Sequence, residues 1–455
     1  MFQNLLEKVR IGFWLLNQKT KYSHVFFYFL LIFLPTQFGR HFWPDFSYIY
    51  GIRVDYLSPT FYFTDLLIVL LLTSWILENI NWSHRIKISK KTFIKMAAFL
   101  LVVLFLILGI IISESPPAGW YGLIKFFEFS FLISYTAKNF RKLNKKLIYS
   151  SFFIGVFFES LLTIFQYINQ GSVGGVMYFL GERSFNPETP GIANASINGQ
   201  LFLRPYGTFS HPNVLAAYLF ISMYLILLLS TRLNFKYKKL FTYFILFLGT
   251  ISIFLSFSRT AIFIWTFSLC MFFIPIFWKK TGIDFVKKFK FKAAESLAAF
   301  AFILVIVIVA FYSPIPGRFS NISLSDESIV QREQLMKDAV VIFNKNFFWG
   351  TGLNNFLINL PPAEKNLHQP FYLQPVHNIF FLVIAETGIP GFTLFLILLT
   401  AIFIRIKSNR EALILFLGVI FLGLFDHYFL TLQQGQILFS LLIGIALSFP
   451  KNAQR

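Results

Sequence analysis

Residues 210–230 read SHPNVLAAYLFISMYLILLLS, a run that contains no Asp, Glu, Lys or Arg. An apolar stretch of about 20 residues is long enough to cross the hydrocarbon core of a bilayer as an α-helix. Comparable runs recur along the 455-residue chain, which is 56% hydrophobic and only 13% charged. Soluble domains carry about 25% charged residues. The sequence therefore predicts an all-α protein that crosses a membrane many times.

Apolar length predicts about twelve transmembrane helices in all. Their approximate limits are 22–39, 60–80, 92–113, 119–137, 147–168, 210–230, 239–257, 260–278, 293–312, 377–404, 411–428 and 434–449. We accordingly divide the chain into residues 1–312 with helices 1–9, residues 313–376 as a cap, and residues 377–455 with helices 10–12.

The short connections after every second predicted helix are strongly basic. They hold Arg85, Lys87, Lys90, Lys91 and Lys95; Lys138, Arg141, Lys142, Lys145 and Lys146; Arg232, Lys236, Lys238 and Lys239; Lys279, Lys280, Lys287, Lys288, Lys290 and Lys292; and Arg405, Lys407 and Arg410. Lys and Arg concentrate in cytoplasmic loops. We therefore expect both termini in the cytoplasm. The same loops account for the net charge of +20, so we do not expect a nucleic-acid partner.

The connections expected on the outer side are longer, and the main ones are residues 40–59, 169–209 and 313–376. Loops of this length without their own secondary structure are usually functional or disordered. In the third, residues 328–346 have the spacing of an amphipathic helix. Its expected apolar side consists of Ile329, Leu335, Val340, Ile342 and Phe343. Gly350 and Gly352 then predict turns. We interpret this segment as a small folded cap.

The first candidate site is LRPYGTFSHPN at residues 203–213. Pro212 suits the first turn of a helix, and Ser210 is a candidate N-cap. Arg204 would then lie near a helix N-terminus, where a guanidinium and backbone N–H groups together form an anion site. The alternative is that Arg204 extends to the lipid headgroups.

The second candidate is Arg259, in the short outer turn SFSRT at residues 256–260. An arginine inside the hydrocarbon costs about 2.5–3.5 kcal/mol at mid-depth, so such residues generally have a partner. We expect an anionic partner for Arg259. A headgroup contact is the alternative.

The third candidate is His377, where the cap re-enters the membrane, followed by Asn378 and by Glu386 within an apolar helix. A neutral imidazole accepts a proton from a hydroxyl near pH 7. The alternative is a histidine that merely caps the helix. Gly388 and Pro390 predict a kink in the same helix.

Two further groups of polar residues have less specific patterns. Asp426, His427 and Tyr428 precede the last predicted helix, which begins with Gln433 and Gln434. These residue types suit sugar contacts, but we favour a solvated turn. Within the predicted spans lie Asp65, Glu159, Lys125 and Glu128, the last two at a helical i, i+3 spacing that predicts an intramembrane ion pair.

Four phrases, RPYGTFSHPN, SFSRTA, GTGLNNF and VHNIFFLVIAETGIPG, resemble in sequence and order the O-antigen ligase family of membrane glycosyltransferases, which also includes O-antigen polymerases. The resemblance extends over about residues 200–395. It implies a GT-C-like fold in the bacterial inner membrane. It also implies transfer of a glycan from an undecaprenyl diphosphate carrier to an acceptor hydroxyl, with inversion and without a metal or other cofactor.

By the same resemblance, Arg204 and Arg259 hold the diphosphate and His377 is the general base. Arg332 corresponds less closely to a further cap arginine. The remaining candidate substrate contacts are His211, Asn378, Glu386, Gln433 and Gln434. The outer loops contain no carboxylate cluster with metal-ligand spacing, in agreement with a metal-free reaction.

The resemblance leaves the acceptor open. Lipid A core, a growing glycan and a protein all require the same donor site, so a ligase, a polymerase and a protein glycosyltransferase remain alternatives. A lipid-glycan transporter would need polar residues along a path through the membrane, whereas here they gather at the outer ends of the helices. A scaffold without activity is the third class, and it gives no reason for two arginines and a histidine at these places.

Overall fold

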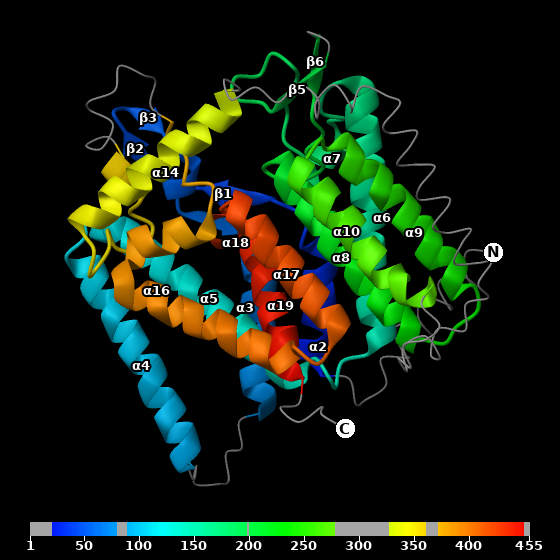
Figure 1. The fold of residues 1–455 in the computed structure, drawn as a ribbon, viewed down its shortest axis with the longest axis horizontal. Helices are drawn as coiled ribbons and strands as arrows, with labels where there is room; N and C mark the ends of the chain where they lie inside the picture. The colour runs from blue at the N-terminus through cyan, green and yellow to red at the C-terminus, as the bar shows by residue number, and fades with distance from the viewer. Residues whose placement is uncertain (1–20, 80–88, 198–199, 278–326, 361–371, 450–455) are drawn as a thin grey trace.

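The computed structural model describes residues 21–79, 89–197, 200–277, 327–360 and 372–449, and in these ranges the chain is mainly helical (Figure 1). The longer helices are α2 Tyr22–Phe33, α3 Phe63–Asn79, α4 Lys90–Ile111, α5 Pro116–Asn139, α6 Lys145–Asn169, α8 Pro212–Arg232, α9 Lys238–Leu255, α10 Arg259–Phe277, α14 Glu327–Lys345, α16 Ile379–Ile406, α17 Arg410–Phe425 and α19 Gln433–Ser448. Between them lie two short helices, α7 Val176–Phe179 and α18 Tyr428–Thr431.

A helix lies at each predicted membrane span that the structure describes; the span predicted at 293–312 falls outside the described residues. Five described helices, α4, α6, α8, α9 and α16, are long and apolar enough to cross a membrane. Shorter apolar helices, among them α2, α10 and α19, accompany them. The chain is therefore a helical, multi-pass membrane protein.

The first predicted span, 22–39, is too long. Helix α2 ends at Phe33, and strand β1 begins at Gly39. Leu34 still has helical backbone angles, but Pro35 has no backbone N–H to continue the hydrogen-bond ladder, so the helix ends there. The chain then forms antiparallel hairpins, with β1 Gly39–His41 paired to β4 Thr60–Tyr62 and β2 Tyr48–Ile49 paired to β3 Ile52–Arg53. A third hairpin joins β5 Asn194–Ile197 to β6 Gln200–Leu203.

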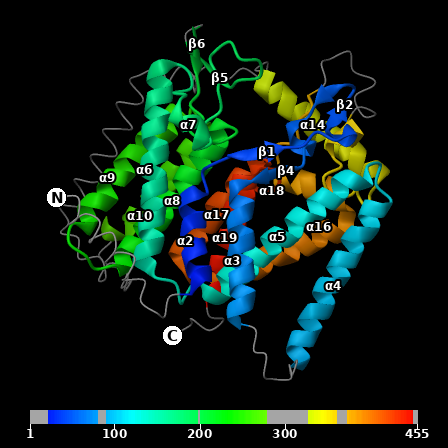
Figure 2. The same ribbon diagram turned by 180° about the vertical axis from the view of Figure 1, so that it is seen from behind.

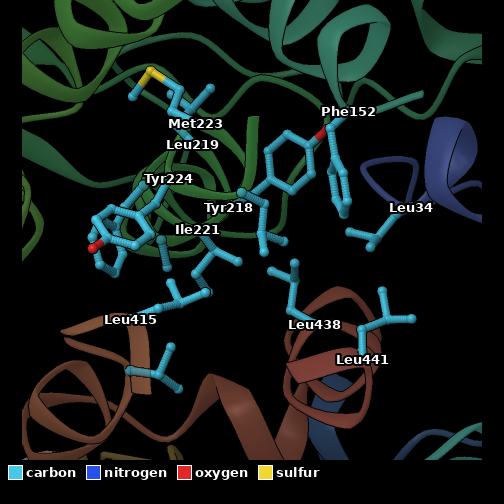
Figure 3. Packing of buried hydrophobic residues seen from close by; sticks show 14 of the residues in the cluster. Leu34, Phe152, Tyr218, Leu219, Ile221, Met223, Tyr224, Leu415, Leu438 and Leu441 are labelled. Carbon is cyan, nitrogen blue, oxygen red and sulfur yellow. The ribbon is translucent and has the colours of Figure 1, made fainter. Parts of the chain in front are cut away.

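Helix α8 forms the centre of the bundle. All of its residues from Pro212 to Leu227 are buried, which is the expected state of a helix that is apolar on every side. It packs against α6 and α9, with further contacts to α10, α17 and α19. Figure 3 shows Tyr218 of α8 close to Phe152 of α6, with Leu438 of α19 facing it. The site residues at the N-terminus of α8 are thus held on a rigid support.

The hairpins, α7 and α14 all lie at one end of the helices in both ribbon views (Figures 1 and 2). This is the end that the sequence assigns to the outer loops. Figure 2 also shows α4 leaning away from the bundle, where its main helical neighbour is α5.

Helix α14 matches the amphipathic helix that the sequence predicts at 328–346. Its Leu335, Ala339 and Ile342 are buried in a second hydrophobic cluster together with residues of α16. Val340 is 43% exposed, so its assignment to the apolar side is wrong. The buried residues of this helix are Leu335, Asp338, Ala339 and Ile342, which have the i, i+3, i+4, i+7 spacing of one helical face, and Val340 lies outside that face.

Helix α16 is kinked at Gly388, as the sequence predicts. Backbone groups of the cap form hydrogen bonds with backbone groups at the kink. Gly388 has φ 59°, outside the helical region. The carbonyl oxygen of Phe347 accepts a hydrogen bond of 2.9 Å from Ile389 N–H, and Thr351 N–H donates to the carbonyl oxygen of Ala385 at 2.9 Å. The kink would otherwise leave these backbone groups unpaired in an apolar environment, at a cost of several kcal/mol each.

Gly388→Ala should therefore destabilise the protein. A Cβ at this position would collide with the carbonyl oxygen of Phe348, and the positive φ disfavours any L side chain. We expect a loss of about 2 kcal/mol or more, measured as a lower Tm of the purified protein. Gly109→Ala in α4 is the matched control, because the nearest atom to its added Cβ would be 3.8 Å away. Equal Tm values for the two variants would contradict the role assigned to the kink.

Candidate active site

A chain of polar contacts connects Arg204 with His377. The Arg204 guanidinium donates from Nε to the carbonyl oxygen of Ser256 at 2.8 Å and from Nη2 to Asn213 Oδ1 at 2.7 Å. Asn213 Nδ2 donates to Asp426 Oδ2 at 2.9 Å, and Asp426 Oδ1 lies 3.5 Å from His377 Nδ1. The site thus joins the loop before α8, the α9–α10 turn, the turn after α17 and the start of α16.

Two buried polar residues of α6 hold the loop that carries Arg204. Gln166 Oε1 accepts hydrogen bonds from the N–H groups of Tyr206 and Gly207 at 2.9 and 2.8 Å. The Glu159 carboxylate accepts from both the N–H and the hydroxyl of Thr208, at 3.0 and 2.7 Å. Glu159, a buried acid in the sequence, therefore has a structural partner.

Arg204 is only 7% exposed, and its contacts are inside the protein. It does not extend to the surface as a headgroup contact requires. The N-cap prediction was wrong by one residue: His211, not Ser210, caps α8, with His211 Nδ1 accepting from Asn213 N–H at 3.1 Å. Pro212 occupies the first turn as predicted.

Arg259 begins α10, in the same tight turn whose Ser256 carbonyl binds Arg204. Phe257 adopts φ 52°, and Ser258 N–H donates to Ser256 Oγ at 3.2 Å. This turn brings the segment of Arg259 directly against the side chain of Arg204. The backbone of Arg259 therefore lies three residues along the chain from the carbonyl that binds Arg204.

The turn after α17 is not solvated, contrary to our expectation. Asp426 is 6% and His427 2% exposed. The ring of His427 lies between those of His377 and Tyr56, with ring centroids 5.1 and 5.4 Å away. The sequence drew attention to Asp426 and His427 as adjacent polar residues. It did not indicate that they lie close to Asn213 and His377.

The electrostatics of this group favour an ionised Asp426 and neutral His211 and His427. Burial opposes ionisation of Asp426, but its interactions with His377, His427 and His211 outweigh burial and hold the pKa of Asp426 well below its usual range. Burial, assisted by the charge of Arg204, lowers the pKa of His211 to about 3. Burial also lowers the pKa of His427 to about 3. The site contains a fixed negative charge beside His377.

The cap contributes Arg332 to this site. The charge of Arg332, on α14, adds to the effect of burial in lowering the pKa values of both His211 and His427. An arginine of the cap thus lies within electrostatic range of the centre. Glu386, by contrast, lies in the α16 kink, where its Oε1 accepts from Phe356 N–H at 3.4 Å.

Three other candidate residues have structural partners. Asn378 caps α16, with its Oδ1 accepting from Phe380 N–H at 2.8 Å and its Nδ2 donating to the carbonyl oxygen of Leu424 at 3.0 Å. Gln434 Nε2 donates to the carbonyl oxygen of Pro35 at 3.4 Å. Gln433 donates to Thr64 Oγ1 at 3.1 Å and to Asp65. These contacts give each residue a role in positioning helices.

The predicted ion pair of Lys125 and Glu128 is present at 3.0 Å, and Asp65 joins it at 2.8 Å from Lys125 Nζ. Lys125 Nζ also donates to Gln433 Oε1 at 3.1 Å. This network connects α3, α5 and α19.

Lys125→Met should strongly destabilise the protein, because it leaves the carboxylates of Asp65 and Glu128 buried without a cation. Breaking a buried pair in this way costs about 3–5 kcal/mol. Thermal unfolding of the purified protein measures the loss. Lys142→Met is the matched control, since Lys142 is exposed at the end of the next connection. A Tm close to that of the control would contradict the network's structural role.

The comparison with known families supports the resemblance. Residues 243–396 match the family model described as O-Antigen ligase. The matched region contains Arg259, Arg332 and His377, whereas Arg204, Asn213 and Asp426 lie outside it. No curated protein sequence gives a significant match. The similarity to the O-Antigen ligase family is thus shown for residues 243–396 of this chain.

Proposed function

We propose that this protein transfers a glycan from an undecaprenyl diphosphate carrier to an acceptor hydroxyl at the outer face of the bacterial inner membrane. The observation that carries the proposal is the contact chain from Arg204 through Asn213 and Asp426 to His377. It connects the guanidinium of Arg204, which can bind a diphosphate, with the imidazole of His377, which can accept a proton from a hydroxyl. We include in the proposal about twelve spans, a GT-C-like arrangement and cytoplasmic termini.

Arg204 and Arg259 are proposed to bind the diphosphate of the donor. Negative charge develops on the leaving diphosphate as the sugar–oxygen bond breaks. Guanidinium groups already fixed in a buried site stabilise this charge without reorganisation. Arg204 is fixed by two hydrogen bonds, to Ser256 and Asn213. In this proposal the two arginines supply the stabilisation without a metal.

His377 is proposed to act as general base. The acceptor oxygen forms the new bond to the anomeric carbon while the bond to the diphosphate breaks, which inverts the configuration. The acceptor proton moves to His377 Nε2, with Nδ1–H facing Asp426. Ionised Asp426 stabilises the imidazolium that forms, and it is already positioned by Asn213. Gln374 Oε1 lies 3.3 Å from Nε2, and in this proposal the acceptor hydroxyl takes its place.

The acceptor is proposed to bind between the cap and the start of α16, next to His377 and within electrostatic range of Arg332. A lipid A core would make the protein a ligase, and this is our first assignment. The family also includes polymerases, which use the same donor with a glycan acceptor.

Reconstitution with undecaprenyl-diphosphate oligosaccharide, with and without lipid A core, distinguishes these activities. Release of undecaprenyl diphosphate only with the core identifies a ligase. Longer lipid-linked chains without the core identify a polymerase. Movement of labelled donor across the vesicle membrane without release of the carrier would overturn the assignment to glycan transfer.

A further inference from the structure

Three metal-ligating atoms converge beside the proposed base. His377 Nδ1, an Asp426 carboxylate oxygen and a ring nitrogen of His427 all lie within 4.8 Å of one another. Asp426 Oδ1 is 3.5 Å from His377 Nδ1 and 3.9 Å from His427 Nε2. We call these three residues the His–Asp–His cluster. Each is contributed by a segment that the fold holds in place, either the start of α16 or the turn before α18.

The hydrogen bonds of His427 direct a lone pair into this cluster. Its Nδ1 is 2.6 Å from Thr431 Oγ1, and the Thr431 hydroxyl in turn donates to the carbonyl oxygen of His427 at 3.3 Å. Because that hydroxyl proton is already used, Thr431 Oγ1 accepts from Nδ1–H. Nε2 therefore carries the lone pair, and it faces Asp426.

His377 has the same arrangement with its nitrogens reversed. Its Nε2 has Gln374 Oε1 at 3.3 Å, while its buried Nδ1 has no hydrogen bond to any residue that the structure describes. A metal-bound imidazole almost always donates its other N–H to a protein acceptor. Thr431 and Gln374 are such acceptors for the two histidines.

Asp426 is also oriented for a cation. Asn213 Nδ2 donates to Asp426 Oδ2, and Oδ1 accepts from the backbone N–H of His427 at 2.9 Å. Oδ1 is also the oxygen nearest to both histidine rings, and it keeps a further lone pair for a cation. Two nitrogen lone pairs and an anionic oxygen facing one another repel unless a cation lies between them. In transfer, that cation is the proton on His377 Nδ1. A metal ion is the other occupant that satisfies all three groups.

The ligand set selects the class of metal. Two imidazoles and one carboxylate, with a fourth position left for water, are a typical Zn²⁺ environment, whereas Mg²⁺ and Ca²⁺ prefer oxygen ligands throughout. The His377 side chain is 15% exposed, compared with 3% for His427 and 8% for Asp426. We therefore expect the metal ion to enter on the side of His377 and a water molecule to bind there as the fourth ligand.

We propose that the His–Asp–His cluster binds one Zn²⁺ and that this binding inhibits transfer. Zn²⁺ takes the lone pair of His377 Nδ1 and engages Asp426, so the single proton of the neutral imidazole lies on Nε2, facing Gln374 Oε1. In this tautomer Nε2 has no lone pair with which to accept a proton from the acceptor hydroxyl. The inhibitory part rests on the proposed function. The nearby charges of Arg204 and Arg332 oppose a cation, so we expect affinity in the micromolar range.

Binding is tested on the full-length protein purified without a histidine tag, by competition for Zn²⁺ with a chromophoric chelator. We expect one Zn²⁺ per chain at micromolar concentration. His427→Gln should weaken binding by about tenfold or more, while His24→Gln in α2, outside the cluster, should bind as the unmodified protein does. No binding at micromolar Zn²⁺, or equal binding by His427→Gln, would overturn the site.

A second, milder substitution tests the same site if His427→Gln does not fold. Thr431→Val keeps the shape of the side chain but removes the acceptor for His427 Nδ1–H, and we expect about tenfold weaker Zn²⁺ binding. Unchanged affinity in a folded Thr431→Val protein would count against the cluster.

The transfer assay then tests inhibition. We expect Zn²⁺ to stop release of undecaprenyl diphosphate, EDTA to restore it, and Thr431→Val to need about tenfold more Zn²⁺. Stoichiometric binding without inhibition would overturn the competition at Nδ1 and leave the metal site in place. If the untreated protein transfers no glycan, the proposed function fails, while the binding experiment alone still decides the zinc site.

Discussion

His377→Ala is expected to abolish most glycan transfer while leaving the donor site folded. General-base catalysis contributes about 10²–10⁴-fold, and the substitution removes all of it. The side chain is 15% exposed and makes no hydrogen bond shorter than the 3.3 Å contact to Gln374 in the described part of the chain, so stability should change little. Single-turnover release of undecaprenyl diphosphate from reconstituted protein measures the chemical step without a contribution from product release.

Two comparisons make this prediction specific. His41→Gln, which changes another histidine among the outer segments, should transfer normally. Asp426→Asn should lose much of the same activity, and adding it to His377→Ala should cause little further loss, because the two groups act as a unit. Full activity of purified His377→Ala protein, or losses that multiply in the double variant, would refute the assignment of His377 as base.

Arg204→Ala is expected to lower the transfer rate by about 10²–10³-fold, the usual effect of removing one donor that stabilises developing negative charge. Arg204→Lys should not restore the rate. The guanidinium binds the Ser256 carbonyl and Asn213 through separate nitrogens at 2.8 and 2.7 Å, and a single ammonium cannot reproduce that fork. The rate at saturating donor is the informative quantity, because the stabilisation is expected in the transition state.

Arg183→Ala provides the matched control for Arg204. Arg183 is also in the second outer loop, but its side chain is 53% exposed and its ion pair with Asp55 is 3.8 Å long. An exposed pair of this kind contributes about 0–1 kcal/mol. We expect normal transfer by this variant. A fully active Arg204→Lys protein would show that charge alone is sufficient and would contradict a fixed guanidinium.

The sequence was most informative where a local pattern determines the structure. Apolar length located α8 and its neighbours, and the Gly388–Pro390 pair located the kink in α16. These features depend on residues close together in the chain. Errors of a few residues, such as the end of α2 at Phe33, are expected because helix ends depend on local capping and on tertiary contacts.

The arrangement of the candidate site depends on contacts that no local pattern encodes. The hydrogen bond between Asn213 and Asp426 joins residues 213 positions apart. Without that contact, Asp426 and His427 had the composition of a solvated turn. Gln433 likewise had the composition of a sugar contact, but Lys125, 308 positions away, gives it a buried partner.

The burial of α8 has a consequence for how the protein responds to its lipid environment. A change in bilayer thickness acts on helices that touch lipid, by changing their tilt or the way in which flanking residues reach the interface. Exposed α4 is subject to this effect, but α8 meets other helices along its buried length. The height of Arg204 relative to His377 should therefore be set by the protein interior, even when acyl chain length varies.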